Sequence, residues 1–158
     1  MTTVVRRAEL ADKDVILALL DEFRSDCSEQ ITGHFVESTT ARNAGQSIYE
    51  SLLSRNDYCI YLLAHSNLKV VGVITGYLCP MLRNGGVRAE VEEFFIQKAY
   101  RGGGNALKLM DAFFDWCKKC KVQKVNLESE NLLDRAHHFY KKYGFETKAQ
   151  RFIKKINN

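Results

Sequence analysis

The spacing of apolar positions changes along the chain, and each change marks an expected boundary between strands and helices. Apolar and polar residues alternate weakly over 3–8, which predicts a short strand. After Asp12, a helix-capping residue, apolar side chains recur at three- and four-residue steps and predict a helix. The pattern weakens between residues 25 and 42, and a second helix is expected over 43–54.

Three apolar runs follow, and their lengths and neighbouring turn formers are typical of strands. The runs 58–64 and 69–78 are joined by a short polar turn, so they predict a hairpin. The third expected strand, 88–97, follows a second turn at Asn84-Gly85-Gly86.

Beyond residue 105 the apolar period lengthens, so helices and strands are expected to alternate. A helix should run from Ala106 to about Lys119, followed by a strand at 122–128. Another helix, about 132–143, should end at Gly144, a residue suited to the position after a helix.

A final strand is expected over 145–153. This order of elements predicts an α/β protein (α+β, with a mixed sheet) and a single domain covering 1–158. The first half of the sheet should be antiparallel, and the second half should contain a β-α-β unit.

Composition and charge set broad limits on function. The 158 residues are 46% apolar, enough for a sizeable core, and carry a net charge of +4. This charge permits an anionic ligand, but no Lys/Arg stripe with interleaved aromatic residues points to nucleic acid. No stretch has the roughly 20 apolar residues that cross a bilayer. No apolar signal core follows the N-terminus. We expect a cytoplasmic protein without membrane contacts.

The five cysteines stand at irregular spacing, which is typical of reduced thiols. Cys117 and Cys120 form a C-x-x-C pair on a helical pattern, without a second pair or a nearby His. We therefore expect neither a metal site nor a redox role.

The most informative segment is a glycine-rich turn between a strand and a helix. Backbone amides in such a turn point inward and the helix dipole adds to them, so the turn suits a pyrophosphate. A P-loop is excluded because its lysine is missing, and a dinucleotide fingerprint because Leu107 replaces its third glycine. A plain connector remains the alternative. The residues assigned to this anion site are Arg101, Gly102, Gly103, Gly104, Asn105 and Ala106.

Arg101, Gly104 and Ala106 match the spacing Arg-x-x-Gly-x-Ala, which resembles the signature of the GNAT superfamily of acetyl-CoA-dependent N-acetyltransferases. Upstream, the segment 92–104 resembles the central strand and turn of the spermidine/spermine diamine acetyltransferases. Downstream, the segment 136–145 resembles the family's Ala-x-x-Phe-Tyr-x-x-x-Gly-Phe element. The order and spacing of these motifs agree, so the resemblance implies the GNAT-like acyl-CoA N-acyltransferase fold.

The resemblance also implies contacts with the co-substrate, acetyl-CoA. The glycine turn would hold the pyrophosphate, and backbone groups at Phe94, Phe95 and Ile96 would bind the pantetheine and polarise the acetyl carbonyl. Many members place an asparagine seven residues before the motif tyrosine, where this chain has Leu133. Asn131 is the candidate to replace it, unless it only caps a helix. No metal is implied.

Two residues are implied to carry the proton transfers. Tyr140 would protonate the departing thiolate, because a phenol with a pKa of about 10 is similar to it in basicity. Tyr143 is the neighbour most easily confused with it. Glu92 would act as the base through water, with Glu90 or water alone as alternatives. Simple alternation places Glu90, Glu92 and Phe94 on one face of the strand, and Val91, Glu93 and Phe95 on the other.

The expected activity is transfer of acetyl from acetyl-CoA to a primary amine of a small molecule (a polyamine is one candidate) or of a peptide, by direct attack in a ternary complex. Two alternatives remain open: an acetyltransferase of aminoacyl-tRNA, and a non-catalytic acyl-CoA-binding regulatory module. Residues 20–55 should select the acceptor. A homodimer is among the expected states, because dimers are common in similar proteins. The acids of this region that could attract a cation are Asp21, Glu22, Asp26 and Glu29.

Overall fold

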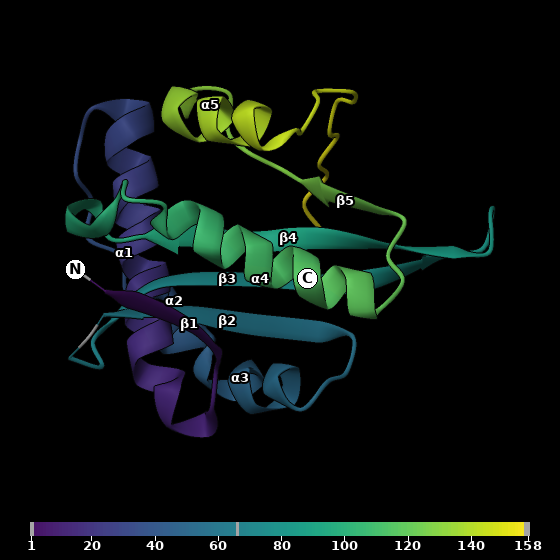
Figure 1. Ribbon diagram of the computed structural model, residues 1–158. Helices are drawn as coiled ribbons and strands as arrows, with labels where there is room; N and C mark the ends of the chain where they lie inside the picture. The colour runs from purple at the N-terminus through teal and green to yellow at the C-terminus, as the bar shows by residue number, and fades with distance from the viewer. Residues whose placement is uncertain (1, 66, 157–158) are drawn as a thin grey trace. The chain divides into compact units, whose positions relative to one another are not determined.

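The protein is described by a computed structural model that covers residues 2–65 and 67–156. The chain divides into two compact units, Met1–Glu128 and Ser129–Asn158. In the first unit, helices cover both faces of a single sheet (Figure 1).

The sheet has five strands, which lie side by side in chain order. The first four are antiparallel neighbours and β5 is parallel to β4, so the predicted mixed sheet is confirmed. A parallel neighbour needs a crossover connection, and helix α4 (Asn105–Lys119) supplies it. The strands are β1 Thr3–Arg7, β2 Tyr58–His65, β3 Val70–Met81, β4 Gly86–Ile96 and β5 Lys124–Leu127.

The helices of the first unit follow the predicted pattern with two differences. Helix α1 continues past residue 25, where the apolar pattern weakens, and stops at Gly33, which adopts a left-handed φ of 75°. The expected helix over 43–54 is instead two short helices that meet at Gly45. Helix α1 spans Lys13–Thr32, α2 spans Thr40–Ala44 and α3 spans Gln46–Leu53. Two short 3-10 helices lie at Leu10–Asp12 and Lys98–Tyr100.

Helix α4 packs on one face of the sheet, while α1 and α3 pack on the other (Figure 1). The α4 side is filled by Leu109, Met110 and Phe113, all fully buried. On the opposite side, Ile16 of α1 and Phe95 of β4 belong to one buried cluster. The apolar stripes that predict the elements therefore also form the core.

The pairing of β3 with β4 shifts by one residue in the middle of the strands. Thr75 of β3 stands opposite two residues of β4, Glu92 and Glu93, which is the geometry of a β-bulge. The pairs that flank the bulge are Ile74 with Phe94 and Gly76 with Val91.

This bulge corrects the expected faces of β4. Glu90 and Phe95 are five residues apart, so alternation would place them on opposite faces. Their partners on β3, Tyr77 and Val73, share the face covered by α1, and Glu90 and Phe95 therefore share it too. Glu93 joins them, because its carboxylate is bonded to a β3 side chain of that face. The predicted grouping of β4 side chains is wrong, since one extra residue reverses the alternation.

The second unit has one helix among its described residues, α5 (Asp134–Tyr143). It ends at Gly144, as predicted. The final strand expected over 145–153 is wrong, because this segment has no regular secondary structure. Phe152 and Ile153 are 89% and 73% exposed. The backbone groups of a strand need a neighbouring strand to bond with, and the described residues of this segment have none.

Candidate active site

Three consecutive glycines connect the end of β4 to helix α4. Gly102, Gly103 and Gly104 have φ angles of 93°, 57° and 81°, all in the left-handed region that other residues rarely adopt. A Cβ atom at any of the three would meet no other atom within 4 Å. The space above the loop is therefore open, and no protein packing explains why these positions lack side chains.

The ends of this loop are joined by Asn105, the first residue of α4. Its Nδ2 donates to the carbonyl of Tyr100 at 2.8 Å, and its Oδ1 accepts from Thr3 Oγ1 at 2.7 Å. The backbone N–H of Asn105 donates to the Gly102 carbonyl at 3.1 Å. From the sequence, Asn105 is expected to bind the co-substrate, and in the structure its side chain fixes the shape of the loop. Ala106, the next residue, is half-buried in the first turn of α4.

Arg101 also links the loop to the rest of the first unit. Its Nε donates to the Ile96 carbonyl at 2.8 Å, and its Nη2 lies 2.7 Å from the Asp26 carboxylate on α1. Its guanidinium lies over the Phe95 ring, 5.5 Å from the centroid. The Arg101 side chain is only 17% exposed, so its charge is paired with Asp26 and is not held at an open rim. Its main effect is to hold the loop against β4 and α1.

A pocket of about 190 Å³ lies at this loop, between Thr3 of β1 and the segment 99–105. The first N–H groups of α4 have no acceptor within the helix, and the helix dipole makes this end positive. An open glycine loop before a 15-residue helix is suited to an anion, and the pyrophosphate site expected from the sequence stays a prediction.

The edge of β4 that faces β5 is paired over a short stretch. The two strands are bonded only from Arg88 to Val91 on β4. Phe94, Phe95 and Ile96 lie beyond this pairing; Phe95 and Ile96 are buried and Phe94 is half-buried. On its β5 side, β4 therefore extends five residues, 92–96, beyond the pairing, and the separation of the two strands that the resemblance implies stays a prediction.

The bulge gives the two acids of β4 different surroundings. Glu92 is exposed, whereas Glu93 is partly buried and its carboxylate accepts a hydrogen bond from Thr75 Oγ1. The N–H of Glu93 donates to the same hydroxyl at 3.1 Å. Burial and the nearby charge of Glu92 raise the pKa of Glu93 to about 7, although the Tyr58 hydroxyl opposes this.

Glu90, the alternative base, is engaged with neighbouring side chains. Its Oε1 lies 3.1 Å from Arg88 Nε and accepts from Asn126 Nδ2 at 3.2 Å. Sequence reasoning named Glu92 and Glu90 but missed Glu93, because the bulge that turns Glu93 toward Thr75 leaves no sign in the periodicity.

The aromatic element of the second unit is a helix C-cap. The N–H of Phe145 donates to the Tyr140 carbonyl at 2.9 Å, and the N–H of Gly144 donates to the Lys141 carbonyl at 3.1 Å, which together form a Schellman motif. This motif brings the residue after the glycine back onto the helix, and the Phe145 and Tyr140 ring centroids are 5.9 Å apart. Phe139 packs on Tyr140 at 5.8 Å. The spacing Phe-Tyr-x-x-x-Gly-Phe therefore fixes the tyrosine ring. Tyr143 stacks on Phe145.

Leu133, which stands at the position of the family asparagine, and Asn131, its candidate replacement, both lie just before α5. Leu133 is buried and precedes the first residue of the helix, while Asn131 is exposed in the preceding turn.

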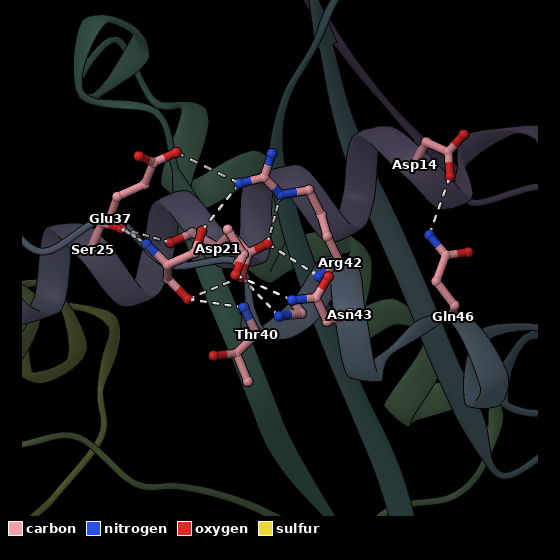
Figure 2. Close-up of polar contacts among 11 residues, drawn as sticks. Asp14, Asp21, Ser25, Glu37, Thr40, Arg42, Asn43 and Gln46 are labelled. Atoms are coloured by element: carbon pink, nitrogen blue, oxygen red, sulfur yellow. Dashed lines mark hydrogen bonds and ion pairs between the residues drawn. The ribbon is translucent and has the colours of Figure 1, made fainter.

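Three of the four acids expected to attract a cation are engaged in contacts within the protein, and one of them, Glu22, accepts a hydrogen bond from Gln97 Nε2 at 2.8 Å. Asp26 is paired with Arg101, and Asp21 is 2% exposed at the centre of the network in Figure 2. Asp21 accepts from the N–H groups of Ala41 and Arg42, at 2.7 and 3.1 Å, from Ser38 Oγ and from Arg42 Nε. Burial opposes the Asp21 charge, but these bonds outweigh it and lower the pKa of Asp21 below its ordinary value.

Asp21 thus fixes the segment between α1 and α2, and Asp21→Asn is expected to lower the free energy of unfolding by about 3 kcal/mol at pH 7, because an amide leaves buried donors unsatisfied. Urea denaturation measures this difference. Because the folded pKa lies below the unfolded one, the contribution of Asp21 is present at neutral pH and is lost as pH falls below about 4. Glu37→Gln, which alters an exposed partner of Arg42, is the matched control with a small expected change. Equal stability of wild type and Asp21→Asn would contradict this role.

In the part of the chain that the structure describes, the cysteines and the acids form no metal site. Cys59 and Cys117 are buried thiols, and burial raises both of their pKa values. Within residues 2–65 and 67–156, no group of three or more His, Cys, Asp or Glu could hold a metal ion. None of the helices in this part of the chain is both long and apolar enough to span a membrane.

The sequence from α1 to the α5 cap matches a family model. The match covers residues 17–145, which include the glycine loop and the aromatic element, and the model is described as the acetyltransferase (GNAT) family. The fold and the match define an acetyl-CoA-dependent N-acetyltransferase. The chain belongs to the GNAT acetyltransferase family.

Solved structures share this fold at low sequence identity. The Arabidopsis thaliana glucosamine-6-phosphate N-acetyltransferase is 21% identical, with a TM-score of 0.76 and coverage of 99% of this chain and 100% of that one. An aminoglycoside acetyltransferase from an uncultured soil metagenomic sample is 16% identical, with a TM-score of 0.76 and coverage of 98% and 97%. The Brucella melitensis ribosomal-protein-alanine N-acetyltransferase is 16% identical, with a TM-score of 0.72 and coverage of 98% and 100%. No curated protein sequence matches the chain.

Proposed function

We propose that the protein acetylates a primary amine of a small molecule or peptide by direct attack on acetyl-CoA in a ternary complex, with residues 1–158 acting as one catalytic domain. The observation that carries this proposal is the open left-handed glycine loop at the N-terminus of α4, beside the unpaired edge of β4.

The loop residues bind the co-substrate through their backbone. The N–H groups of Gly102, Gly103 and Gly104 and of the first turn of α4 hold the pyrophosphate, while Arg101 and Asn105 keep the loop in shape. Backbone groups of β4 at 94–96 bind the pantetheine and polarise the acetyl carbonyl. Asn131 adds a contact in place of the family asparagine. Acetyl-CoA supplies the activated acyl group.

The chemistry requires a neutral amine and a protonated leaving thiolate. Tyr140 donates the proton to the thiolate, and the packing of its ring between Phe139 and Phe145 supports this role. Glu92, one of the two acids at the β4 bulge, is the group that accepts a proton from the acceptor ammonium through water.

The acceptor is proposed to be a cationic amine, of which a polyamine is one example. The solved relatives are named for three different acceptors, a sugar phosphate, aminoglycosides and a ribosomal protein, so the shared fold accommodates several amines. A turnover screen with polyamines, aminoglycosides, amino acids, peptides and aminoacyl-tRNA, read by thiol release, tests the proposal. We expect release with small cationic amines. CoA binding without turnover of any acceptor would favour the regulatory module instead.

No cysteine is expected to carry the acetyl group, because none of the five lies in the glycine loop or in the aromatic element. Burial also keeps Cys59 and Cys117 protonated, whereas the attacking species would be a thiolate. Intact-mass measurement after incubation with acetyl-CoA alone should show no acetylated protein, and initial-rate lines should intersect. A stable acetyl-cysteine, or parallel lines from ping-pong kinetics, would contradict direct transfer.

A further inference from the structure

Helix α1 is bonded at two points to the segment that leads into the glycine loop. Gln97 Nε2 donates to Glu22 Oε2 at 2.8 Å, and Arg101 Nη2 donates to Asp26 Oδ2 at 2.7 Å. Glu22 and Asp26 are four residues apart on α1, and side chains at that spacing lie on the same face of a helix. The two bonds therefore align one face of α1 with the segment 97–101.

The bond between Asp26 and Arg101 is the more protected of the two. The two side chains are 16% and 17% exposed, whereas Glu22 is exposed. Gln30, one turn further along α1, donates to the same Asp26 oxygen at 2.7 Å, so the carboxylate is also oriented from its own helix. A pair with little access to water is held more firmly than a surface pair, because neither charge is solvated well in another arrangement.

Arg101 carries this contact to the glycine loop. Its Nε donates to the Ile96 carbonyl at the end of β4, and the three glycines follow it directly. The space around the glycines is open, so packing does not fix the loop there. The position of the loop depends instead on bonds at its two ends, made by Arg101 and by Asn105. The Arg101 end is the one that is bonded to α1.

The turn of α1 that precedes Asp26 also forms one wall of a second pocket. This pocket has a volume of about 210 Å³ and lies between α1 and the segment 35–42. Ser25 on α1 and Glu37 on the facing segment both line it (Figure 2). The pocket belongs to the part of the chain that is expected to select the acceptor. The bond from Asp26 to Arg101 therefore sets the position of the glycine loop relative to this wall.

We propose that Asp26 is a positioning residue for the co-substrate site: through Arg101 it holds the glycine loop in the shape that binds the pyrophosphate. This assignment rests on the proposed function. Without the carboxylate, the Arg101 guanidinium loses its ion-pair partner and turns toward water, so the loop has the binding shape for a smaller fraction of the time. The apparent Kd rises in inverse proportion to that fraction.

The sign of the effect separates positioning from simple charge. Asp26 is negative and CoA is an anion, so removal of the carboxylate would strengthen CoA binding if only its charge mattered. Loss of positioning weakens CoA binding instead. The direction of the change in Kd therefore distinguishes the two roles.

The test is the Kd for CoA, measured by calorimetry, in wild type, Asp26→Asn, Arg101→Gln and the double variant. Asp26→Asn should raise the Kd about tenfold, the result expected when the loop has the binding shape about a tenth of the time. Asp26→Asn should add no further loss when Arg101→Gln is already present, because Asp26 acts through that arginine. Asp14→Asn removes one charge from the exposed start of the same helix and is the matched control, with the wild-type Kd.

A second variant separates loss of positioning from loss of the fold. Asp26→Glu keeps the charge and displaces the carboxylate by one methylene, so its Kd should lie between those of wild type and Asp26→Asn. Both variants should retain the wild-type circular dichroism spectrum, and Asp26→Glu decides the question if Asp26→Asn does not fold. An unchanged or lower Kd in the folded Asp26 variants, or additive losses in the double variant, would overturn the assignment. Wild-type protein that binds no CoA would instead overturn the proposed function itself.

Discussion

Tyr140→Phe is expected to lower turnover by about 100- to 10,000-fold, the usual contribution of a general acid. The substitution keeps the ring that packs on Phe139 and Phe145, so the Schellman cap should remain intact while the proton-donating hydroxyl is removed. The Kd for acetyl-CoA should change little, because the hydroxyl acts mainly in the transition state. Thiol release at saturating acceptor measures the first effect, and calorimetry measures the second.

Tyr143→Phe is the matched control, since Tyr143 lies in the same aromatic group and on the same helix. It should remain near the wild-type rate. A rise of kcat with pH, which reports deprotonation of the amine or of its base, should survive in Tyr140→Phe. If Tyr140→Phe keeps more than about half of the wild-type rate, another group supplies the proton.

Gly104→Val should abolish CoA binding while the protein still folds. Gly104 has a φ of 81°, and a Cβ added there meets no atom beyond the adjoining residues within 4 Å, so the valine side chain should project into the proposed pyrophosphate site. The left-handed backbone adds strain of roughly 1–2 kcal/mol for any residue with a Cβ. Calorimetric titration with CoA measures the loss of affinity, and thermal unfolding measures the strain.

Gly33→Val separates the two effects of this substitution. Gly33 has a similar φ of 75° and equally open space, but it ends helix α1 and is not part of the glycine loop. It should lose comparable stability and keep the wild-type Kd for CoA. Unchanged affinity in a folded Gly104→Val protein would show that CoA is held elsewhere.

Periodicity predicts most of the fold because helices and strands bury regular stripes of side chains. The four antiparallel strands, the crossover through α4 and the end of α5 at Gly144 all follow from spacing and turn residues. The predicted strand at 145–153 fails because a strand depends on a partner backbone that no local pattern specifies.

The parts of the candidate site that depend on local backbone conformation are predicted from the sequence. The parts that depend on contacts between side chains far apart in the sequence are missed. The glycine loop is readable because consecutive glycines imply left-handed backbone. The pairing of Arg101 with Asp26 joins residues 75 positions apart, and no local spacing indicates it. The bond between Glu93 and Thr75 depends on a register shift between two strands, which local spacing does not record.

The bulge adds one residue to β4 without changing which residues pair with β3 on either side of it. Val91 and Phe94 keep their partners on β3 on either side of the extra residue. A chain one residue shorter at this point would therefore retain both halves of the strand in their present orientation, with one acid opposite Thr75 instead of two. A deletion of one residue at the bulge would therefore remove an acid from the sheet and leave the faces of both flanking segments unchanged.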